Sequence, residues 1–159
     1  MVLVFFWLTR PNVMDPRELS GIRSDPVNGE RVFHSASCSA CHATDLRGGL
    51  ELASPYGTFR VPNISPDNDT GIGGWTMEEF CNALRRGVSP EGEHYYPAFP
   101  YTSYARMTTQ DVADLKAYIE EQPPVRNQVA DHDLAFPWNI RRGIGLWKLR
   151  YLDPGPHLI

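Results

Sequence analysis

The sequence has no hydrophobic run of membrane-spanning length, few cysteines and no excess of positive charge. Residues 2–8 are apolar, but seven residues fall short of the about 20 that a bilayer-spanning helix needs. Three cysteines, an odd number, argue against a disulfide framework. A net charge of −4 without any basic run argues against a nucleic-acid partner. No Ser/His/Asp set, phosphate loop or nucleotide-binding glycine pattern is found, so neither hydrolysis nor nucleotide chemistry is indicated.

The composition is that of a globular protein with much loop structure. The chain has 159 residues, of which 42% are hydrophobic and 21% charged, which suits one domain with one core. Its 14 prolines and 13 glycines predict many turns and few long helices. Such a chain gains stability from a bound group around which it can fold.

Three segments carry clear helix signals. Thr76 and Glu79 form a capping box, and Gly87 marks the end of the helix that follows it. Thr108 and Asp111 resemble a second capping box. The predicted helices cover residues 28–36, 76–87 and 108–121, and the pattern allows a fourth helix over 137–151.

The segments between these helices are long for a compact domain. Residues 43–75 are rich in glycine and show little periodicity, apart from a short extended stretch at 56–61. Residues 88–107 form a second loop rich in proline and tyrosine. Loops of this length normally pack on something, and a bound group would supply that surface.

Cys38-x-x-Cys41-His42 is a haem c attachment signature. Two thiols at this spacing reach the two vinyl groups on one porphyrin edge, and the adjacent histidine then lies under the iron. A structural zinc site would need four ligands, whereas Cys81 stands alone and His34 is badly placed. A thioredoxin-like pair would open a helix in a βαβ pattern, and that pattern is absent. The motif therefore predicts one covalent haem c with iron.

The order of motifs resembles that of class I cytochromes c. Gly29-x-x-x-Phe33 precedes the cysteine pair, and a long loop, a methionine and a last helix with Leu115 and Tyr118 follow it. A more specific likeness, to the cytochrome c subunits of membrane-bound bacterial alcohol and aldehyde dehydrogenases, rests on segments 57–67, 70–75 and 96–104. The resemblance implies an all-α class I cytochrome c fold of three main helices with long loops around the haem, plus a C-terminal extension. Those subunits often carry two or three haem domains, whereas this chain has one motif, as a single-haem member or a piece of a longer protein.

Met107 is the predicted distal iron ligand. Class I cytochromes place their ligand methionine in the loop before the last helix, which is where Met107 lies. His94 shares this loop, and its polar neighbours indicate a solvated side chain. Met77 lies on the apolar face of its helix, and Met14 precedes the haem domain. A proline carbonyl orients the proximal imidazole in class I cytochromes, and Pro55 and Pro62 both compete for this role.

The segments outside the haem domain are expected to direct or dock the protein. Residues 1–27 read as the remnant of a signal or membrane anchor followed by a polar tether, residues 28–124 as the haem domain, and residues 125–159 as an extension. The extension places Ile140, Ile144, Trp147 and Tyr151 on one helical stripe, beside basic residues. Such a segment suits an acidic partner or a membrane surface, and it equally suits covering the protein's own core.

These patterns predict an electron carrier rather than an enzyme. It would work in the periplasm, on the outer face of the inner membrane if anchored there. Electrons would come from a dehydrogenase and pass to an oxidase, a quinone-linked complex or another cytochrome. The alternative is a haem enzyme subunit, peroxidase-like or thiosulfate-oxidising, with an open or displaceable distal position.

Overall fold

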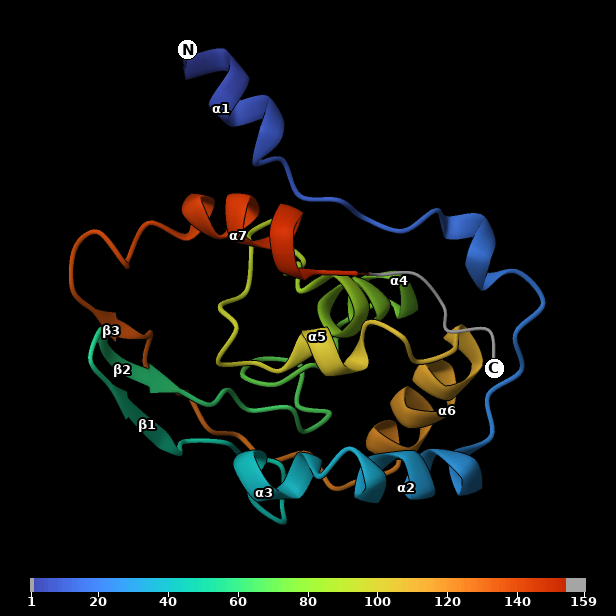
Figure 1. Cartoon of the computed structure of the whole chain (residues 1–159). Coiled ribbons are helices and arrows are strands. Elements are labelled where there is room, and N and C mark those ends of the chain that lie inside the picture. The colour runs from blue at the N-terminus through green and yellow to red at the C-terminus, as the bar shows by residue number, and fades with distance from the viewer. Residues whose placement is uncertain (1, 154–159) are drawn as a thin grey trace.

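Two helices, α2 (Pro26–Ser35) and α6 (Thr109–Glu120), pack against each other at the lower right of the computed structural model, which describes residues 2–153 (Figure 1). Gly29 lies at their closest approach, where a Cβ atom would come within 2.0 Å of the Asp114 carbonyl oxygen. One turn further on, the rings of Phe33 and Tyr118 lie 5.2 Å apart. The glycine and the aromatic residues of the motifs quoted above therefore lie where the two helices pack together.

The middle helix is made of two parts. An α-helical turn, α4 (Met77–Cys81), continues into a π-helical turn, η2 (Asn82–Arg86). Thr76 and Glu79 form the predicted capping box, and Gly87 ends the helix with a φ of +59°. The helix buries Phe80, Cys81 and Leu84 in the core, so the lone cysteine of the sequence is a packing residue.

The core joins all of these helices. Its buried members come from α2, α4, η2 and α6, from the loops between them and from the N-terminal segment: Met14, Phe33, Leu46, Ile72, Phe80, Cys81, Leu84, Val112, Leu115 and Ile119.

A small antiparallel sheet departs from the all-α expectation. Strands β1 (Glu51–Ser54) and β2 (Gly57–Arg60) form a hairpin, and β3 (Asp133–Leu134) pairs with β2. Gly57 has a φ of +123°, and a Cβ there would lie 2.1 Å from the Asp133 carbonyl oxygen. The long loop over residues 43–75 therefore folds partly on itself as a hairpin, and residues far along the chain add the third strand.

Two short helices flank the remaining loops. Helix α3 (Cys38–His42) follows α2 directly, and α5 (Tyr101–Tyr104) interrupts the loop over residues 88–107. That loop also contains an isolated bridge between Val88 and His94.

The N-terminal segment is more closely attached than the expected tether. Helix α1 (Val2–Leu8) projects from the body, and the 3₁₀-helix η1 (Pro16–Leu19) lies further along (Figure 1). Met14 is only 3% exposed, and its backbone N–H donates to the Asn82 side chain. Part of the tether is therefore core.

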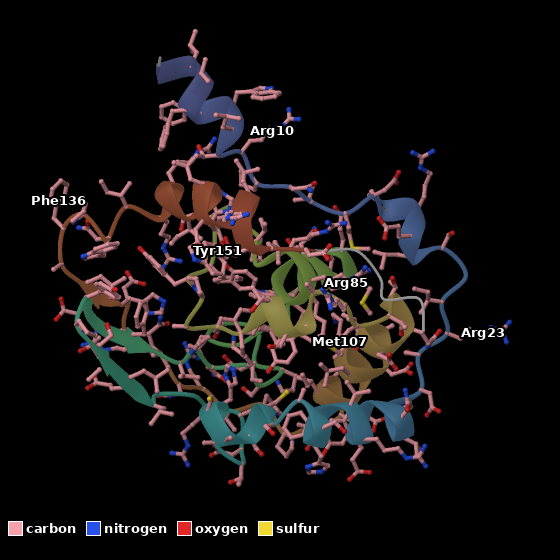
Figure 2. All side chains as sticks on the ribbon, in the orientation of Figure 1. Arg10, Arg23, Arg85, Met107, Phe136 and Tyr151 are labelled. Atoms are coloured by element: carbon pink, nitrogen blue, oxygen red, sulfur yellow. The ribbon has the colours of Figure 1, made fainter. Side chains whose placement is uncertain are left out.

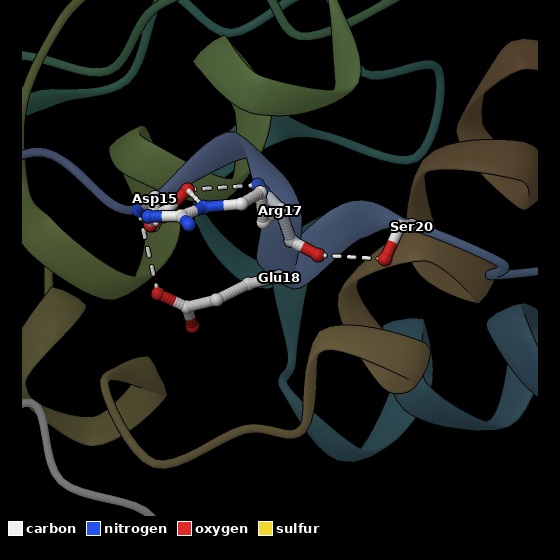
Figure 3. A network of polar contacts seen from close by, with 4 residues as sticks. All are labelled: Asp15, Arg17, Glu18 and Ser20. Atoms are coloured by element: carbon white, nitrogen blue, oxygen red, sulfur yellow. Dashed lines mark hydrogen bonds and ion pairs between the residues drawn. The ribbon is translucent and has the colours of Figure 1, made fainter.

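A local polar network holds η1 in shape (Figure 3). The Asp15 carboxylate accepts from the backbone N–H and the guanidinium of Arg17, and Glu18 accepts from the Asp15 backbone N–H. A second Glu18 oxygen lies 3.9 Å from the Arg85 guanidinium. The capping box thus stabilises η1, and the contact between Glu18 and Arg85 holds it beside η2.

Helix α1 is too short for a transmembrane helix. Within residues 2–153, none of the helices combines the length and apolar character that crossing a bilayer requires. The reading of residues 1–27 as a signal or anchor remnant stays a prediction.

The last helix begins later than expected. The 3₁₀-turn η3 (Arg141–Gly143) leads into α7 (Ile144–Tyr151). Gly145 and Lys148 form its most buried face, whereas Ile140 and Tyr151 of the predicted stripe are exposed. Ile140 precedes the helical residues, so it does not share one helical face with Ile144, Trp147 and Tyr151 as predicted. Apolar periodicity also does not reveal the buried Lys148, which finds carbonyl partners.

Candidate functional site

Helix α3 presents two unpaired thiols and an imidazole. Its five residues lie between two non-glycine residues of positive φ, Ser37 at +57° and Ala43 at +65°. Cys38 is half-buried and Cys41 exposed, and neither forms a disulfide. Residues three apart on a helix share one face, so both thiols can reach one edge of a flat ligand. His42 follows them directly.

One backbone carbonyl fixes the His42 ring. Nδ1 of His42 lies 2.8 Å from the carbonyl oxygen of Pro62. The carbonyl can only accept, so Nδ1 carries the proton and Nε2 keeps its lone pair for a metal. Burial lowers the pKa of His42 and outweighs this hydrogen bond, which favours the neutral ring.

The partner of His42 is therefore Pro62, as one of the two alternatives predicted. Pro55 lies in the turn between β1 and β2, away from this role. Backbone hydrogen bonds hold Pro62 in place, since Gly49 donates to Val61 and Ile64 donates to Leu46.

Gly48 allows the segment after His42 to approach the backbone of Pro62 closely. It has a φ of +68°, and a Cβ there would lie 2.2 Å from the Pro62 carbonyl oxygen. Its N–H donates to the carbonyl oxygen of His42. Gly48 thus connects the histidine to the segment that orients it, which sequence spacing alone did not reveal.

The donor set fits haem c better than it fits a structural zinc site or a thioredoxin-like pair. Within residues 2–153, no group of three or more His, Cys, Asp or Glu side chains is placed to hold a metal ion. Burial raises the pKa of the Cys38 thiol to about 11, whereas a thioredoxin-like pair depends on a lowered one. Two unpaired thiols and an imidazole with a free Nε2 are the groups that thioether attachment and iron ligation require.

The segment that carries Met107 lies beside the cysteine pair. The Tyr104 hydroxyl donates to the carbonyl oxygen of Ala36, just before α3, over 3.0 Å. The Met107 N–H donates in turn to the Tyr104 carbonyl oxygen. Met107 is partly buried and packs against the core. Burial, together with the nearby sulfurs of Cys38 and Cys41, raises the pKa of Tyr104.

The other candidate ligands are engaged elsewhere. His94 was expected to be solvated, but it is only 3% exposed, and its Nε2 lies 2.8 Å from the Thr9 carbonyl oxygen. Met14 belongs to the core, and Met77 packs against it with its sulfur 3.8 Å from that of Cys81. The expectation that Met77 is a core residue is consistent with this packing.

Several loop aromatic residues pack on protein rather than facing solvent. Tyr96 makes tilted and edge-on contacts with Phe59 and His132, and Tyr101 is fully buried under Lys148. Arg60 donates to Glu51 and to the Asp131 carbonyl oxygen, so it ties the hairpin to the C-terminal segment. Sequence reasoning missed this role because the contact with Asp131 spans 71 residues.

A sequence profile of the family described as cytochrome c matches residues 26–123, which include α2, the cysteine pair and α6. The chain belongs to the cytochrome c family. Members of this family carry covalent haem c, which agrees with the donor set described above.

Curated relatives of this cytochrome include subunits of dehydrogenases. It is 50% identical to a diheme cytochrome c-type protein of Cereibacter sphaeroides, over 96% of this chain and 54% of the relative. It is 38% identical to the fructose dehydrogenase cytochrome subunit of Gluconobacter japonicus, over 88% of this chain and 30% of the relative. It is 36% identical to the cytochrome c subunit of the alcohol dehydrogenase (quinone) of Gluconobacter oxydans, over 78% and 27%. The resemblance to dehydrogenase cytochrome subunits is confirmed, and the chain spans about half or less of these relatives.

Proposed function

We propose that this chain is an electron carrier that holds one haem c. Cys38 and Cys41 form the thioether bonds, His42 is the proximal iron ligand and Met107 the distal one. The observation that carries the proposal is the His42–Pro62 hydrogen bond, which leaves Nε2 as a metal donor beside two free thiols. In attachment, each S–H adds across a vinyl C=C bond: sulfur bonds to one carbon, the hydrogen goes to the other, and no oxidant is consumed.

The ligand surroundings suit a carrier. Haem c supplies a one-electron ferric/ferrous couple when bound. Pro62 holds the His42 ring, and the turn from Tyr104 holds the Met107 backbone. Residues fixed in this way remain in place in both oxidation states, so little reorganisation accompanies electron transfer. A thioether also favours the ferrous state more than a second imidazole would.

A dehydrogenase is the proposed electron donor. The named relatives support it, since two are cytochrome subunits of fructose and alcohol dehydrogenases. The acceptor would be an oxidase, a quinone-linked complex or another cytochrome. Because thioether attachment takes place outside the cytoplasm, we place the protein in the periplasm, at the outer face of the inner membrane if residues 1–27 anchor it.

Covalent attachment can be tested with three single cysteine variants, each expressed with the haem-attachment machinery. Cys38→Ala and Cys41→Ala each leave at most one thioether bond, so we expect little mature haem protein. Cys81→Ala is the matched control, because this thiol is also unpaired but lies in the core, and it should keep covalent haem. Pyridine haemochrome spectra report the number of thioether bonds. Haem that extracts completely from the unaltered protein into acidified organic solvent would refute the proposal.

A further inference from the structure

A cationic cavity lies where the N-terminal segment, helix α7 and the end of η2 meet. Its volume is about 200 Å³, several times the roughly 30 Å³ of one water molecule, so it admits a phosphate group. Arg10, Arg86, Lys148 and His94 line it, and no Asp or Glu is among the described residues of its wall.

Two cations of this cavity, Arg10 and Arg86, form no ion pair with a carboxylate of the described residues. Burial, and next the neighbouring Arg85, lowers the pKa of Arg86, and Glu18 opposes this only in part.

Lys148 donates to the carbonyl oxygens of Arg86 and Gly87 and lies over the Tyr101 ring. Burial lowers the pKa of Lys148 to about 7, so Arg10 and Arg86 supply most of the positive charge. An anion would offset the cost of holding these charges together.

The walls of the cavity are apolar, and they continue into an exposed apolar surface. Leu8 and Leu149 line the cavity beside the cations. Leu149 is 66% exposed, and the outward side chains of α1 reach 85% exposure at Leu3. Trp7 and Tyr151 are also exposed there. An isolated anion would leave this apolar surface in water, whereas an amphipathic anion would cover it.

Hydrogen bonds hold the C-terminal end of helix α1 beside the cavity. Arg142 donates to the Thr9 hydroxyl and to the Phe6 carbonyl oxygen, while His94 lies against the Thr9 carbonyl. These bonds fix the C-terminal end of α1 on the body, and the helix projects above α7 (Figure 1). The cations therefore sit at the base of an apolar, aromatic-bearing projection, which is the arrangement of an interfacial anchor.

We infer that this cavity binds the phosphate headgroup of an anionic phospholipid, with α1 and Leu149 in contact with the acyl region of a bilayer. The surface would place the domain against the membrane through a defined lipid contact. This contact needs neither the haem nor the proposed iron ligands.

The test compares binding of the holoprotein to two kinds of vesicle by co-sedimentation: phosphatidylcholine alone, and phosphatidylcholine mixed with phosphatidylglycerol. We expect a clear preference for the anionic vesicles. Arg10→Gln and Arg86→Gln should each reduce the partition coefficient about 5-fold, and together about 30-fold, because a cation near an anionic surface contributes about 1 kcal/mol. Arg23→Gln is the matched control, since Arg23 is exposed far from Arg10 (Figure 2), and it should change little.

Two further arms separate the alternatives. Leu149→Ser keeps every charge and should weaken vesicle binding, whereas tight binding of free glycerol phosphate with no effect of Leu149→Ser would make this a soluble-anion site and overturn the lipid proposal. Equal binding by the double variant and the unaltered protein, or no binding of the unaltered protein to anionic vesicles, would overturn it too. An unchanged visible haem spectrum shows that each variant is folded.

Discussion

Met107 and His94 are the two soft donors of the segment over residues 88–107, and their surroundings differ sharply. His94 is buried against Thr9 and Gly145, while Met107 follows the turn that Tyr104 ties to the start of α3. We therefore expect Met107→Ala to remove the distal ligand. The haem should become high-spin or bind water, and its reduction potential should fall by on the order of 0.1 V, within the roughly 0.8 V range that axial ligands span.

His94→Ala is the matched comparison for this prediction. It removes the contact with Thr9 and should loosen the attachment of α1 while the haem spectrum keeps its low-spin form. Visible spectra and potentiometry on both variants decide the matter. If Met107→Ala stays six-coordinate and low-spin with the same potential, and His94→Ala turns high-spin, the iron has two histidine ligands instead.

At single residues, the sequence predicted which side chains carry the chemistry better than it predicted the residues that surround them. The spacing of Cys38, Cys41 and His42 is a local pattern, and the structure keeps all three on one short helix. The carbonyl that orients His42 depends on the hairpin, which decides between Pro55 and Pro62. His94 was misread as solvated because the residues that bury it come from the two ends of the chain.

At the scale of elements, Gly29 determines how closely α2 and α6 can approach each other. Gly29→Ala would add a Cβ within 2.0 Å of the Asp114 carbonyl oxygen and 2.8 Å of the Tyr118 Cβ. Alanine improves helix propensity by about 1 kcal/mol, but overpacking of this kind costs about 1–3 kcal/mol and requires the helices to separate. We expect a lower free energy of unfolding, measured by denaturant titration followed by circular dichroism.

Gly143→Ala is the control for the Gly29 variant. Nothing lies within 4 Å of a Cβ at this position, and its φ is negative, so stability should be unchanged or slightly higher. A Gly29→Ala protein as stable as the unaltered one would show that α2 and α6 can separate without cost.

The helices were predictable because their signals are local. Capping residues and apolar periodicity marked α2, the α4–η2 pair and α6 to within a few residues. The sheet was not predictable in the same way, because β3 joins β2 from more than 70 residues away. The π-helical turn also lacks a simple sequence signal, since it differs from an α-helix only in its hydrogen-bond register.

At the scale of the whole molecule, the two ends of the described chain close on the same side of the body. Thr9 bonds with His94 and Arg142, and Lys148 bonds with the carbonyls that end η2. These contacts are polar and long-range, so apolar periodicity could not predict them. They make part of the C-terminal segment a cover for the protein's own loop, while its outward face remains free for the lipid contact inferred above.

Asp114 of α6 connects this helix to the start of α2, and its charge should control acid stability. Its carboxylate is 2% exposed and accepts from the Asp25 N–H, the Asn28 amide and the Gln110 amide. Burial raises its pKa, but these hydrogen bonds outweigh burial and lower the pKa below the ordinary value of about 3.9. The stabilisation is therefore complete above about pH 4 and is lost as the pH falls through the lowered pKa.

Asp114→Asn should remove this stabilisation at every pH, because an amide oxygen cannot satisfy all three donors. We expect a loss of roughly 2 kcal/mol at pH 7, with a smaller further loss than in the unaltered protein as the pH falls from about 5 to 3. Asp45→Asn is the control: Arg47 also lowers the pKa of Asp45, but that pair is solvent-exposed, so its removal should matter little. Denaturant titrations at each pH measure the difference. Parallel pH curves for the unaltered and Asp114→Asn proteins would show that other carboxylates control acid unfolding.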